Sequence, residues 1–253
     1  MSQKSITQLL AREWFYPFQL PGGETTPTYN GGMLDEVHAT RLEMMDAALR
    51  PVFGGSLAGQ SAIDLACHQG YFSSELIQRG ADSVVGIDAR AEHVQDATDI
   101  CAAMQFDNFR AEQCDVHALD FDRLGQFDIV LNFGLIYHLE DPIGALRASR
   151  KLCRRVCLVE TQVVPGVSGW VDWGNYRFVR PLKGSLGIID EHGETHAPEA
   201  STTGICLAPD IPGLLWLMQK VGFDRVELIE PPKNGYEQHV GFKRVMAAGY
   251  IDN

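Results

Sequence analysis

The sequence predicts an α/β fold with a seven-stranded, mostly parallel sheet and helices on both faces. Short apolar runs alternate with helix-like stretches from about residue 61 onward. One run, FDIVLNF at 127–133, is apolar almost throughout, which is typical of a strand buried on both faces of a parallel sheet. The 253 residues suffice for one such domain with extensions. We expect an N-terminal cap at 1–58 and a main domain at 59–253, with a long insertion at 164–208 after the fifth strand.

The first half of the main domain reads as successive βαβ units. Strands are expected at 61–66 and 83–88, with a helix at 71–80 that a glycine ends. A second helix at 91–104 leads to a strand at 109–114, and the buried strand at 127–133 follows. The order of these elements favours parallel pairing, because each strand is followed by a helix that can cross the sheet.

The second half completes the sheet. Asp141 and Pro142 are typical of a helix cap and first helical position, so a helix is expected at 142–153, followed by a fifth strand at 156–161. After the insertion, a helix at 212–221 ends at Gly222, and two further strands are expected at 223–229 and 241–248.

The N-terminal segment differs from the main domain. A stretch rich in Pro, Gly and Thr at 20–32 precedes a helix expected at 34–49. Its apolar positions recur at helical spacing, which favours packing against the main domain: Leu34, Val37, Leu42, Met45 and Leu49.

Composition limits the partners. The net charge of −12 disfavours nucleic acid, because an acidic surface repels phosphate backbones. No apolar run approaches the roughly 18 residues of a membrane span, and the first ten residues lack the pattern of an export signal. Six scattered cysteines without Cys-x-x-Cys spacing favour reduced thiols. We therefore predict a cytoplasmic protein that does not bind membranes and for which nucleic acid is a disfavoured partner.

The loop after the first strand carries the first chemical signal. Asp64-Leu-Ala-Cys-His-Gln-Gly70 lies at the carboxyl edge of the sheet, where open α/β sheets bind ligands. Asp88 ends the second strand, where a carboxylate can accept hydrogen bonds from both hydroxyls of an adenosine ribose. Loop and acid together predict a cofactor that contains adenosine.

The glycines of this loop distinguish between cofactors. NAD and FAD need G-x-G-x-x-G so that the backbone can approach their pyrophosphate, but Ala66 and His68 stand at two of those places. S-adenosylmethionine has no phosphate, and its ammonium suits a strand-end carboxylate such as Asp64. The loop therefore favours S-adenosyl-L-methionine over a nicotinamide cofactor.

At these residues the chain resembles the class I S-adenosylmethionine-dependent methyltransferases, which have a Rossmann-like fold. The resemblance covers roughly residues 60–165 and departs from the family's first two glycines at Ala66 and His68. It implies that the cofactor is bound by four segments: Asp64, Ala66, Cys67, His68, Gly70, Tyr71 and Phe72; Asp88, Ala89 and Arg90; Cys114, Asp115 and Val116; and Asn132, Phe133 and Gly134.

Three further segments resemble the branch that contains the tRNA wobble-uridine carboxymethyltransferases. They are WFYPFQLPGG at 14–23, GLIYH at 134–138 and the helix-strand pair at 214–230. That branch has an arginine directly after the Tyr-His pair, where this chain has Leu139 and Glu140, and its N-terminal extension is much longer. A tRNA-modifying (carboxy)methyltransferase is therefore an alternative function.

Methyl transfer needs an aligned acceptor and, where the acceptor is protonated, a base. His138 follows the fourth strand, where the methyl group should project, and imidazole suits proton transfer at neutral pH. His138 is the candidate base, with a structural role at a strand-helix junction as the alternative. Tyr137 is the candidate for orienting the acceptor through its hydroxyl, or it packs under the cap.

The insertion contains aromatic and basic residues, and long insertions at an active edge commonly form lids or partner surfaces. A lid would hold a small-molecule acceptor, and the same residues could form a homodimer interface. The candidate substrate residues are Trp170, Trp173, Tyr176 and Arg177 in the insertion, with Trp14 and Tyr16 in the cap. Glu191, His192, Glu194 and His196 cluster in this segment, but solvated loop residues explain them and no metal is expected.

The sequence thus favours an S-adenosylmethionine-dependent methyltransferase that acts on a small molecule by in-line displacement. The alternatives from other classes are a tRNA-modifying enzyme and a non-catalytic partner protein that keeps the same fold.

Overall fold

The structure is a computed structural model that describes residues 6–172, 174, 180–191, 201 and 203–252. Seven strands form one sheet in the order β10-β11-β5-β4-β1-β2-β3. Neighbouring strands are parallel except at β11, which runs antiparallel to both β5 and β10. The predicted seven-stranded, mostly parallel sheet is confirmed. Its strands are β1 (Ser61–Leu65), β2 (Ser83–Asp88), β3 (Phe109–Gln113), β4 (Phe127–Phe133), β5 (Cys153–Gln162), β10 (Arg225–Ile229) and β11 (Arg244–Tyr250).

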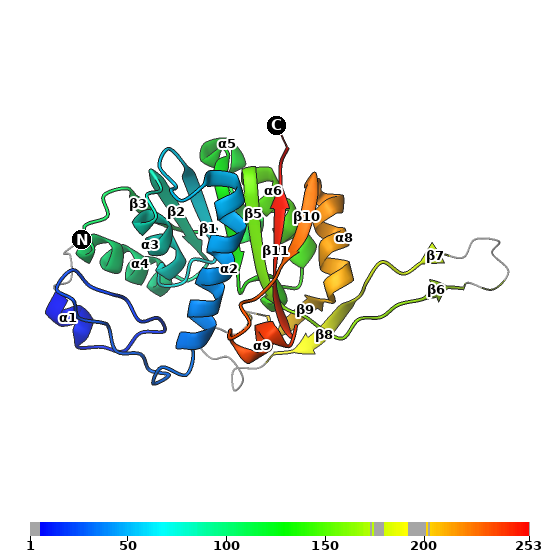
Figure 1. Ribbon diagram of the computed structural model, residues 1–253, viewed down its shortest axis with the longest axis horizontal. Helices are drawn as coiled ribbons and strands as arrows, with labels where there is room; N and C mark the ends of the chain where they lie inside the picture. The colour runs from blue at the N-terminus through cyan, green and yellow to red at the C-terminus, as the bar shows by residue number, and fades with distance from the viewer. Residues whose placement is uncertain (1–5, 173, 175–179, 192–200, 202, 253) are drawn as a thin grey trace.

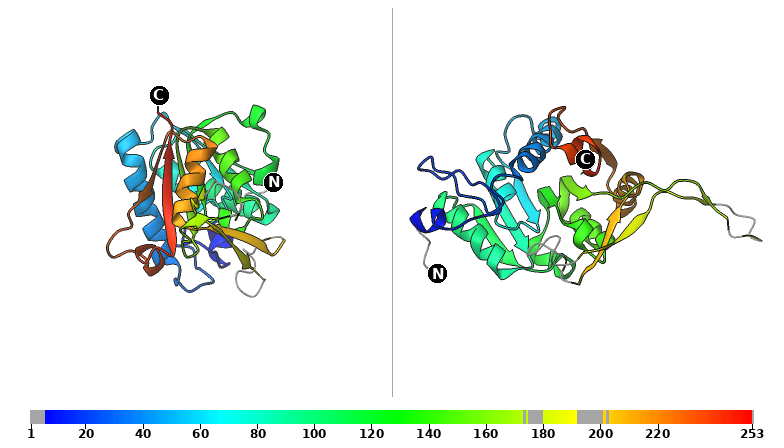
Figure 2. Two further views of the ribbon diagram at one scale, coloured as in Figure 1. Left: turned by 90° about the vertical axis from the view of Figure 1, so that its right-hand side faces the viewer. Right: turned by 90° about the horizontal axis from the view of Figure 1, so that it is seen from below.

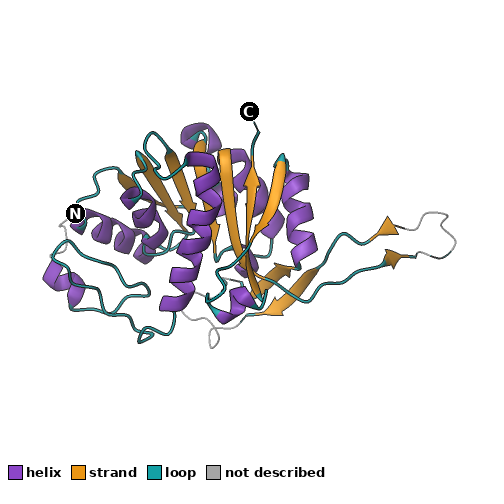
Figure 3. Ribbon diagram, viewed as in Figure 1, coloured by secondary structure: helices purple, strands orange, loops and turns teal. Residues whose placement is uncertain are grey.

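Helices cover both faces of this sheet (Figure 1, Figure 3). One face carries α2 (Asp35–Phe53), α3 (Tyr71–Gln78) and α4 (Ala91–Ala103), and the other carries α5 (Phe121–Leu124), α6 (Pro142–Leu152) and α8 (Ile211–Val221). Alternate side chains of each strand enter one of two apolar clusters. In β1, for example, Ala62 packs toward α2 and α3, whereas Ile63 packs toward α6. The edge-on view places α2 and α8 on opposite sides of β11 (Figure 2).

The ends of most elements fall within one to four residues of their predicted positions, and β5 shows why some differ. β5 begins at Cys153, directly after α6, because Cys153 pairs with Phe127 of β4. The two arginines that follow Cys153 interrupt the apolar pattern, so the sequence places the start of the strand at 156. Arg154 is tolerated at this position because its guanidinium reaches the Asp128 carboxylate at 2.8 Å. The short helices η1 (Val116–Ala118), η2 (Ile136–His138) and α9 (Glu237–Val240) were not predicted.

The N-terminal cap is held by its own polar contacts and by the main core. Its first helix is α1 (Ile6–Leu10), and the indole N–H of Trp14 donates to the carbonyl of Leu9 at 2.8 Å. The Thr26 hydroxyl accepts from the Phe18 amide and donates to the Tyr16 carbonyl. Trp14 and Phe18 belong to the same apolar cluster as α2 and α3. The cap is therefore packed onto the domain as part of its core.

The insertion forms two small antiparallel ribbons, β6 (Trp170–Val171) with β7 (Arg180–Pro181), and β8 (Leu186–Asp190) with β9 (Ile205–Pro209). β6 and β7 lie on an arm that extends away from the sheet (Figure 1, Figure 2). Asp210 anchors the root of this arm. Its carboxylate caps α8 through the Gly213 amide and also accepts from the amides of Ser185 and Val167.

None of the described helices is long and apolar enough to cross a membrane. All six cysteines are unpaired.

A buried charge cluster joins α2 to the last strand of the sheet in chain order, β11. Glu160 of β5 is 0% exposed and lies 2.9 Å from Arg41 of α2 and 3.0 Å from Arg244 of β11. His239 of α9 lies 3.1 Å from the same carboxylate. Burial alone would raise the pKa of Glu160, but the two guanidinium groups outweigh it and hold the pKa well below its usual range. Glu160 is therefore ionised at neutral pH.

We expect Glu160→Gln to lower the free energy of unfolding by about 3 kcal/mol or more, because two buried guanidinium groups lose their shared counter-charge. Urea unfolding at neutral pH measures this loss. Glu36→Gln is the matched control, since Glu36 is exposed on α2 and its replacement should change stability by less than about 0.5 kcal/mol. Equal effects of the two substitutions would show that the charge cluster does not stabilise the fold.

Candidate active site

The loop after β1 has an unusual backbone that brings it close to β2. Ala66, His68 and Gly70 all have positive φ angles of 60°, 50° and 80°. A Cβ at Gly70 would lie 2.9 Å from the Cβ of Ala97, so only glycine fits where α3 begins beside α4. The Cys67 amide donates to the Ile87 carbonyl at 2.9 Å, which ties the loop to β2. The loop therefore reaches the end of β2 in a defined shape, although it lacks two of the family's glycines.

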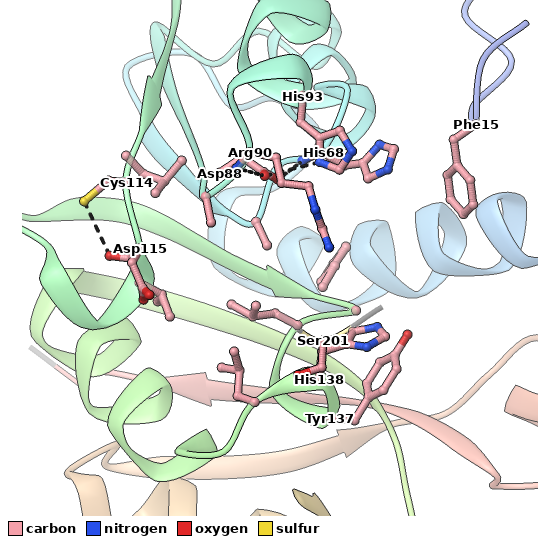
Figure 4. A pocket seen from close by; sticks show the side chains of 18 of the residues that line it. Phe15, His68, Asp88, Arg90, His93, Cys114, Asp115, Tyr137, His138 and Ser201 are labelled. Atoms are coloured by element: carbon pink, nitrogen blue, oxygen red, sulfur yellow. Dashed lines mark hydrogen bonds and ion pairs between the residues drawn. The ribbon is translucent and has the colours of Figure 1, made fainter. Parts of the chain in front are cut away.

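Asp88 organises the next part of the site. One carboxylate oxygen accepts from the His68 amide at 2.9 Å, and the other accepts from the Arg90 amide at 2.9 Å and lies 3.2 Å from His93 Nδ1. Burial on its own would raise the pKa of Asp88, but the hydrogen bonds and charge of His93 outweigh it and lower the pKa. Asp88 is thus an ionised acceptor at the pocket wall (Figure 4).

Asp64 lies behind the loop. It is 2% exposed, and its carboxylate accepts a hydrogen bond from the Ser73 hydroxyl of α3 at 2.8 Å. Burial raises its pKa to about 7, which the hydrogen bond from Ser73 only partly offsets. Asp64 therefore changes charge near neutral pH and does not itself line the pocket.

A pocket with a cavity of about 200 Å³ lies between the loop after β1 and the segment after β4. Figure 4 shows Asp88, His68 and Arg90 on one wall, and Tyr137, His138 and Ser201 facing them on the other. The described residues that line it are Phe15, Tyr16, Arg41, Ala66, His68, Ile87, Asp88, Ala89, Arg90, His93, Cys114, Asp115, Val116, Phe133, Gly134, Leu135, Tyr137, His138, Leu139 and Ser201.

The wall after β4 combines a tyrosine, a histidine and a cation. Gly134 has a φ of 66°, and a Cβ there would lie 3.5 Å from Arg41 and 3.9 Å from the Tyr137 hydroxyl. The same hydroxyl accepts from Arg244 at 3.2 Å. Arg41 and Arg244 both pair with the buried Glu160. The Arg41 guanidinium therefore places a positive charge close to Gly134.

His138 is held by the insertion. Its Nδ1 lies 2.7 Å from the Glu191 carboxylate, which also accepts from the Cys206 thiol at 3.3 Å and from the Ser201 amide at 2.7 Å. The atoms of His138, Glu191 and Cys206 that could bind a metal lie within 4.8 Å of one another, so among the described residues this group could hold a metal ion. The His138 imidazole, the Cys206 thiol and the Ser201 amide all contact one oxygen of Glu191, so the same atoms form a hydrogen-bonded cluster. The other residues of the cluster considered from the sequence lie at 192–196, outside the described residues.

Most of the residues predicted to bind the cofactor line this pocket, and the others of that set lie behind it. Cys67 and Gly70 shape the loop, and Tyr71 stacks on the ring of Tyr16 at 4.8 Å. Phe72 contacts the ring of Phe133 at 4.9 Å. Asn132 is buried and donates to the Ser149 hydroxyl. The sequence analysis expected these residues and Asp64 to bind the cofactor, but none of them lines the pocket.

Two predicted substrate residues lie away from the pocket. Trp14 is 0% exposed within the cap, where its indole N–H donates to the Leu9 carbonyl. It therefore cannot contact an acceptor. Trp170 is 67% exposed on the arm that extends from the sheet. Tyr16 does line the pocket. Trp173, Tyr176 and Arg177 lie outside the described residues.

Several pocket residues were not predicted. Arg41 was hidden in a helix whose pattern indicated packing alone, and Phe15 lies between two residues that were singled out. His93 could have been found, because it lies in the first turn of the helix that follows Asp88. Ser201 lies in the insertion, where no local pattern indicates that the chain returns to the site.

Comparison with known proteins identifies the domain. Residues 57–164 match the family model of a methyltransferase domain. This segment contains the loop after β1, Asp88 and the Tyr137-His138 pair. The resemblance to methyltransferases drawn from the sequence is therefore confirmed over residues 57–164.

The ubiquinone biosynthesis O-methyltransferase of Acinetobacter baylyi is 29% identical over 121 residues, which cover 48% of this chain and 48% of the relative. The tRNA U34 carboxymethyltransferase of Trichodesmium erythraeum is 27% identical over 124 residues, which cover 44% of this chain and 34% of the relative. The chain therefore matches about half or less of the length of these curated relatives. The crystal structure of the N-terminal domain of EvdMO1 with SAH bound covers 94% of this chain and 92% of that chain, with a TM-score of 0.67 and 19% identity. This likeness supports the Rossmann-like methyltransferase fold.

The raised pKa of Asp64 predicts a measurable pH effect. Because the folded protein keeps a proton that the unfolded chain releases near pH 4, stability falls as pH rises from about 4 to about 7, by about 1.4 kcal/mol per pH unit for this group. In Asp64→Asn the group is absent, so the stability of the variant relative to wild type should increase over this range. Denaturant unfolding at several pH values measures this. Asp107→Asn, at an exposed position, is the control, and its stability relative to wild type should not change with pH. If the relative stability of Asp64→Asn also stays constant with pH, the raised pKa is contradicted.

Proposed function

We propose that this protein transfers a methyl group from S-adenosyl-L-methionine to a small-molecule acceptor that carries a proton on its accepting atom. The observation that carries the proposal is the opposition of Asp88 and the loop after β1 to Tyr137 and His138 across one pocket. The residues present fit the cofactor. Asp88 is ionised and faces the pocket, and the loop provides no cluster of glycine amides for a pyrophosphate.

Asp88 would accept hydrogen bonds from the ribose hydroxyls, while Cys114, Asp115 and Val116 would border the adenine. The cofactor supplies a methyl group on a sulfonium, which makes it an electrophile. Gly134 has no side chain, which leaves space for the acceptor beside the Tyr137 hydroxyl and the Arg41 guanidinium. The Tyr137 hydroxyl would orient the acceptor.

His138 would remove the proton of the acceptor. As the bond between the acceptor atom and the methyl carbon forms, the carbon–sulfur bond breaks with its electron pair staying on sulfur, and the acceptor's proton passes to the imidazole. The name of the Acinetobacter relative, an O-methyltransferase, supports a hydroxyl as the acceptor group.

The small-molecule acceptor is preferred to tRNA because the chain has a net charge of −12. We further propose a cytoplasmic location, supported by the six unpaired cysteines, and association into a homodimer through the insertion, supported by the exposed Trp170 and Ile188.

The first test is calorimetric titration with S-adenosylhomocysteine. We expect wild type to bind it and not NAD, and Asp88→Ala to weaken binding at least about 100-fold, because two hydrogen bonds to a charged acceptor are lost. Asp107→Ala, at an exposed position, should bind like wild type. If wild type binds neither nucleotide, the proposed methyl transfer is wrong and the non-catalytic alternative stands.

One observation favours a second candidate function, transfer of a carboxymethyl group. A carboxylate on the transferred carbon would need a cation near Gly134, and the Arg41 guanidinium lies there. The name of the Trichodesmium relative supports the same chemistry. Either donor would use the same loop and the same Asp88.

Calorimetry with S-adenosylmethionine and with its analogue carboxylated on the S-methyl carbon separates the two candidates. If the second is correct, the carboxylated donor binds more tightly, and Arg41→Met removes this preference while Arg41→Lys keeps part of it. Arg50→Met, at an exposed position on the same helix, is the control and should leave both affinities unchanged. Tighter binding of the uncarboxylated donor by wild type would exclude the second candidate.

A further inference from the structure

The insertion brings a buried carboxylate into contact with the candidate base. Glu191 follows β8 and is 5% exposed, 53 positions after His138 along the chain. Among the described residues, its carboxylate accepts from His138 Nδ1, the Ser201 amide and the Cys206 thiol. No part of the proposed transfer described above assigns a role to this acid.

The contact is supported by the backbone. The Leu207 amide of β9 donates to the Leu139 carbonyl at 3.1 Å, directly after η2 and His138. The Glu191 amide donates to the Gly204 carbonyl and continues the pairing of β8 with β9. The ribbon β8–β9 therefore lies against η2, and the carboxylate and the imidazole are positioned by neighbouring backbone segments.

Glu191 is an anion in this setting. Burial alone would raise its pKa, but the hydrogen bonds from His138 and Ser201 outweigh burial and lower the pKa. A carboxylate that only accepts hydrogen bonds requires a proton on the imidazole nitrogen that faces it. In the neutral imidazole, the proton then lies on Nδ1 and the basic lone pair lies on Nε2.

We propose that Glu191 is the positioning residue for His138, holding the imidazole in the tautomer whose Nε2 can take the proton of the acceptor. This inference rests on the proposed function for its use in catalysis, whereas the tautomer itself does not depend on it. When Nε2 takes the proton, the resulting imidazolium lies beside the Glu191 carboxylate, and the proton then leaves to solvent. The insertion is thus part of the active site through Glu191.

The first measurement is nitrogen-15 NMR of wild-type protein labelled at histidine, with the His138 signals assigned by their loss in His138→Gln. We expect Nδ1 of the neutral ring to be protonated and Nε2 to be unprotonated. In Glu191→Gln the amide can donate to Nδ1, so the population should shift toward protonated Nε2. Asp190→Asn, an exposed acid at the adjacent position, should leave the spectrum unchanged. A wild-type ring protonated on Nε2 would overturn the proposal without any variant.

The kinetic test uses an acceptor found by screening. Glu191→Gln should lower kcat by about 10²-fold to 10⁴-fold with little change in KM or in S-adenosylhomocysteine affinity, since only proton removal is affected. Asp190→Asn should retain wild-type kcat. A Glu191→Gln enzyme with wild-type kcat would overturn the positioning role.

Metal analysis of the purified protein completes the design. Stoichiometric zinc that Glu191→Gln removes would overturn the proposal, because His138 Nδ1 would then be a ligand and not a donor to Glu191. Failure of wild type to bind S-adenosylhomocysteine would instead reject the proposed function, while the NMR result on the tautomer would still stand. The two failures are therefore distinguishable.

Discussion

The buried carboxylate of Glu160 is the constraint on which one whole wall of the pocket depends. It lies near the end of the central strand β5 and binds Arg41 of α2, Arg244 of β11 and His239 of the short helix α9 between β10 and β11. An ionised group at 0% exposure is stable only if its partners are fixed, so these three elements cannot move independently. Arg244 also reaches the Tyr137 hydroxyl, and this contact carries the constraint to the pocket.

The two walls of the pocket present different charged groups to a ligand. The wall built on β1 and β2 has the Asp88 carboxylate beside Arg90, whereas the wall after β4 has Arg41 paired with Glu160 and His138 paired with Glu191. A ligand whose polar hydroxyls meet Asp88 and whose anionic part meets Arg41 would satisfy both walls. Because the charges come from different layers of the fold, this arrangement depends on the complete sheet, with β11 in place, and not on the matched segment 57–164 alone.

The sequence predicted the part of this structure that local pattern determines. The strands, the seven-stranded sheet and the ends of β1 and β2 follow from apolar runs and the residues that close them, and Asp88 and Gly70 could be found because their roles depend on position relative to a strand. Arg41 and Glu191 could not be found in this way. Arg41 lies on a helix whose visible signal is its apolar face, and Glu191 reaches His138 only through the path of a long insertion. The sequence also favoured Trp14 as a substrate residue because it is aromatic, but a large ring in a small cap is needed for the cap's own core.

The anchoring of the insertion explains how one segment can be both an exposed arm and part of a buried site. The Asp210 carboxylate accepts from the amides of Val167 and Ser185, so the outgoing and returning segments of the arm are held together where they leave the domain. Beyond that root, β8 and β9 turn back along η2 and bring Glu191 to His138. The outer ribbon β6–β7 is therefore separated from His138 by this anchored root. Displacing β8 and β9 would break the hydrogen bond between Leu207 and Leu139 and expose the Glu191 carboxylate. The same displacement would separate the Glu191 carboxylate from the imidazole of His138. The orientation of His138 and the packing of β8 and β9 against η2 therefore change together.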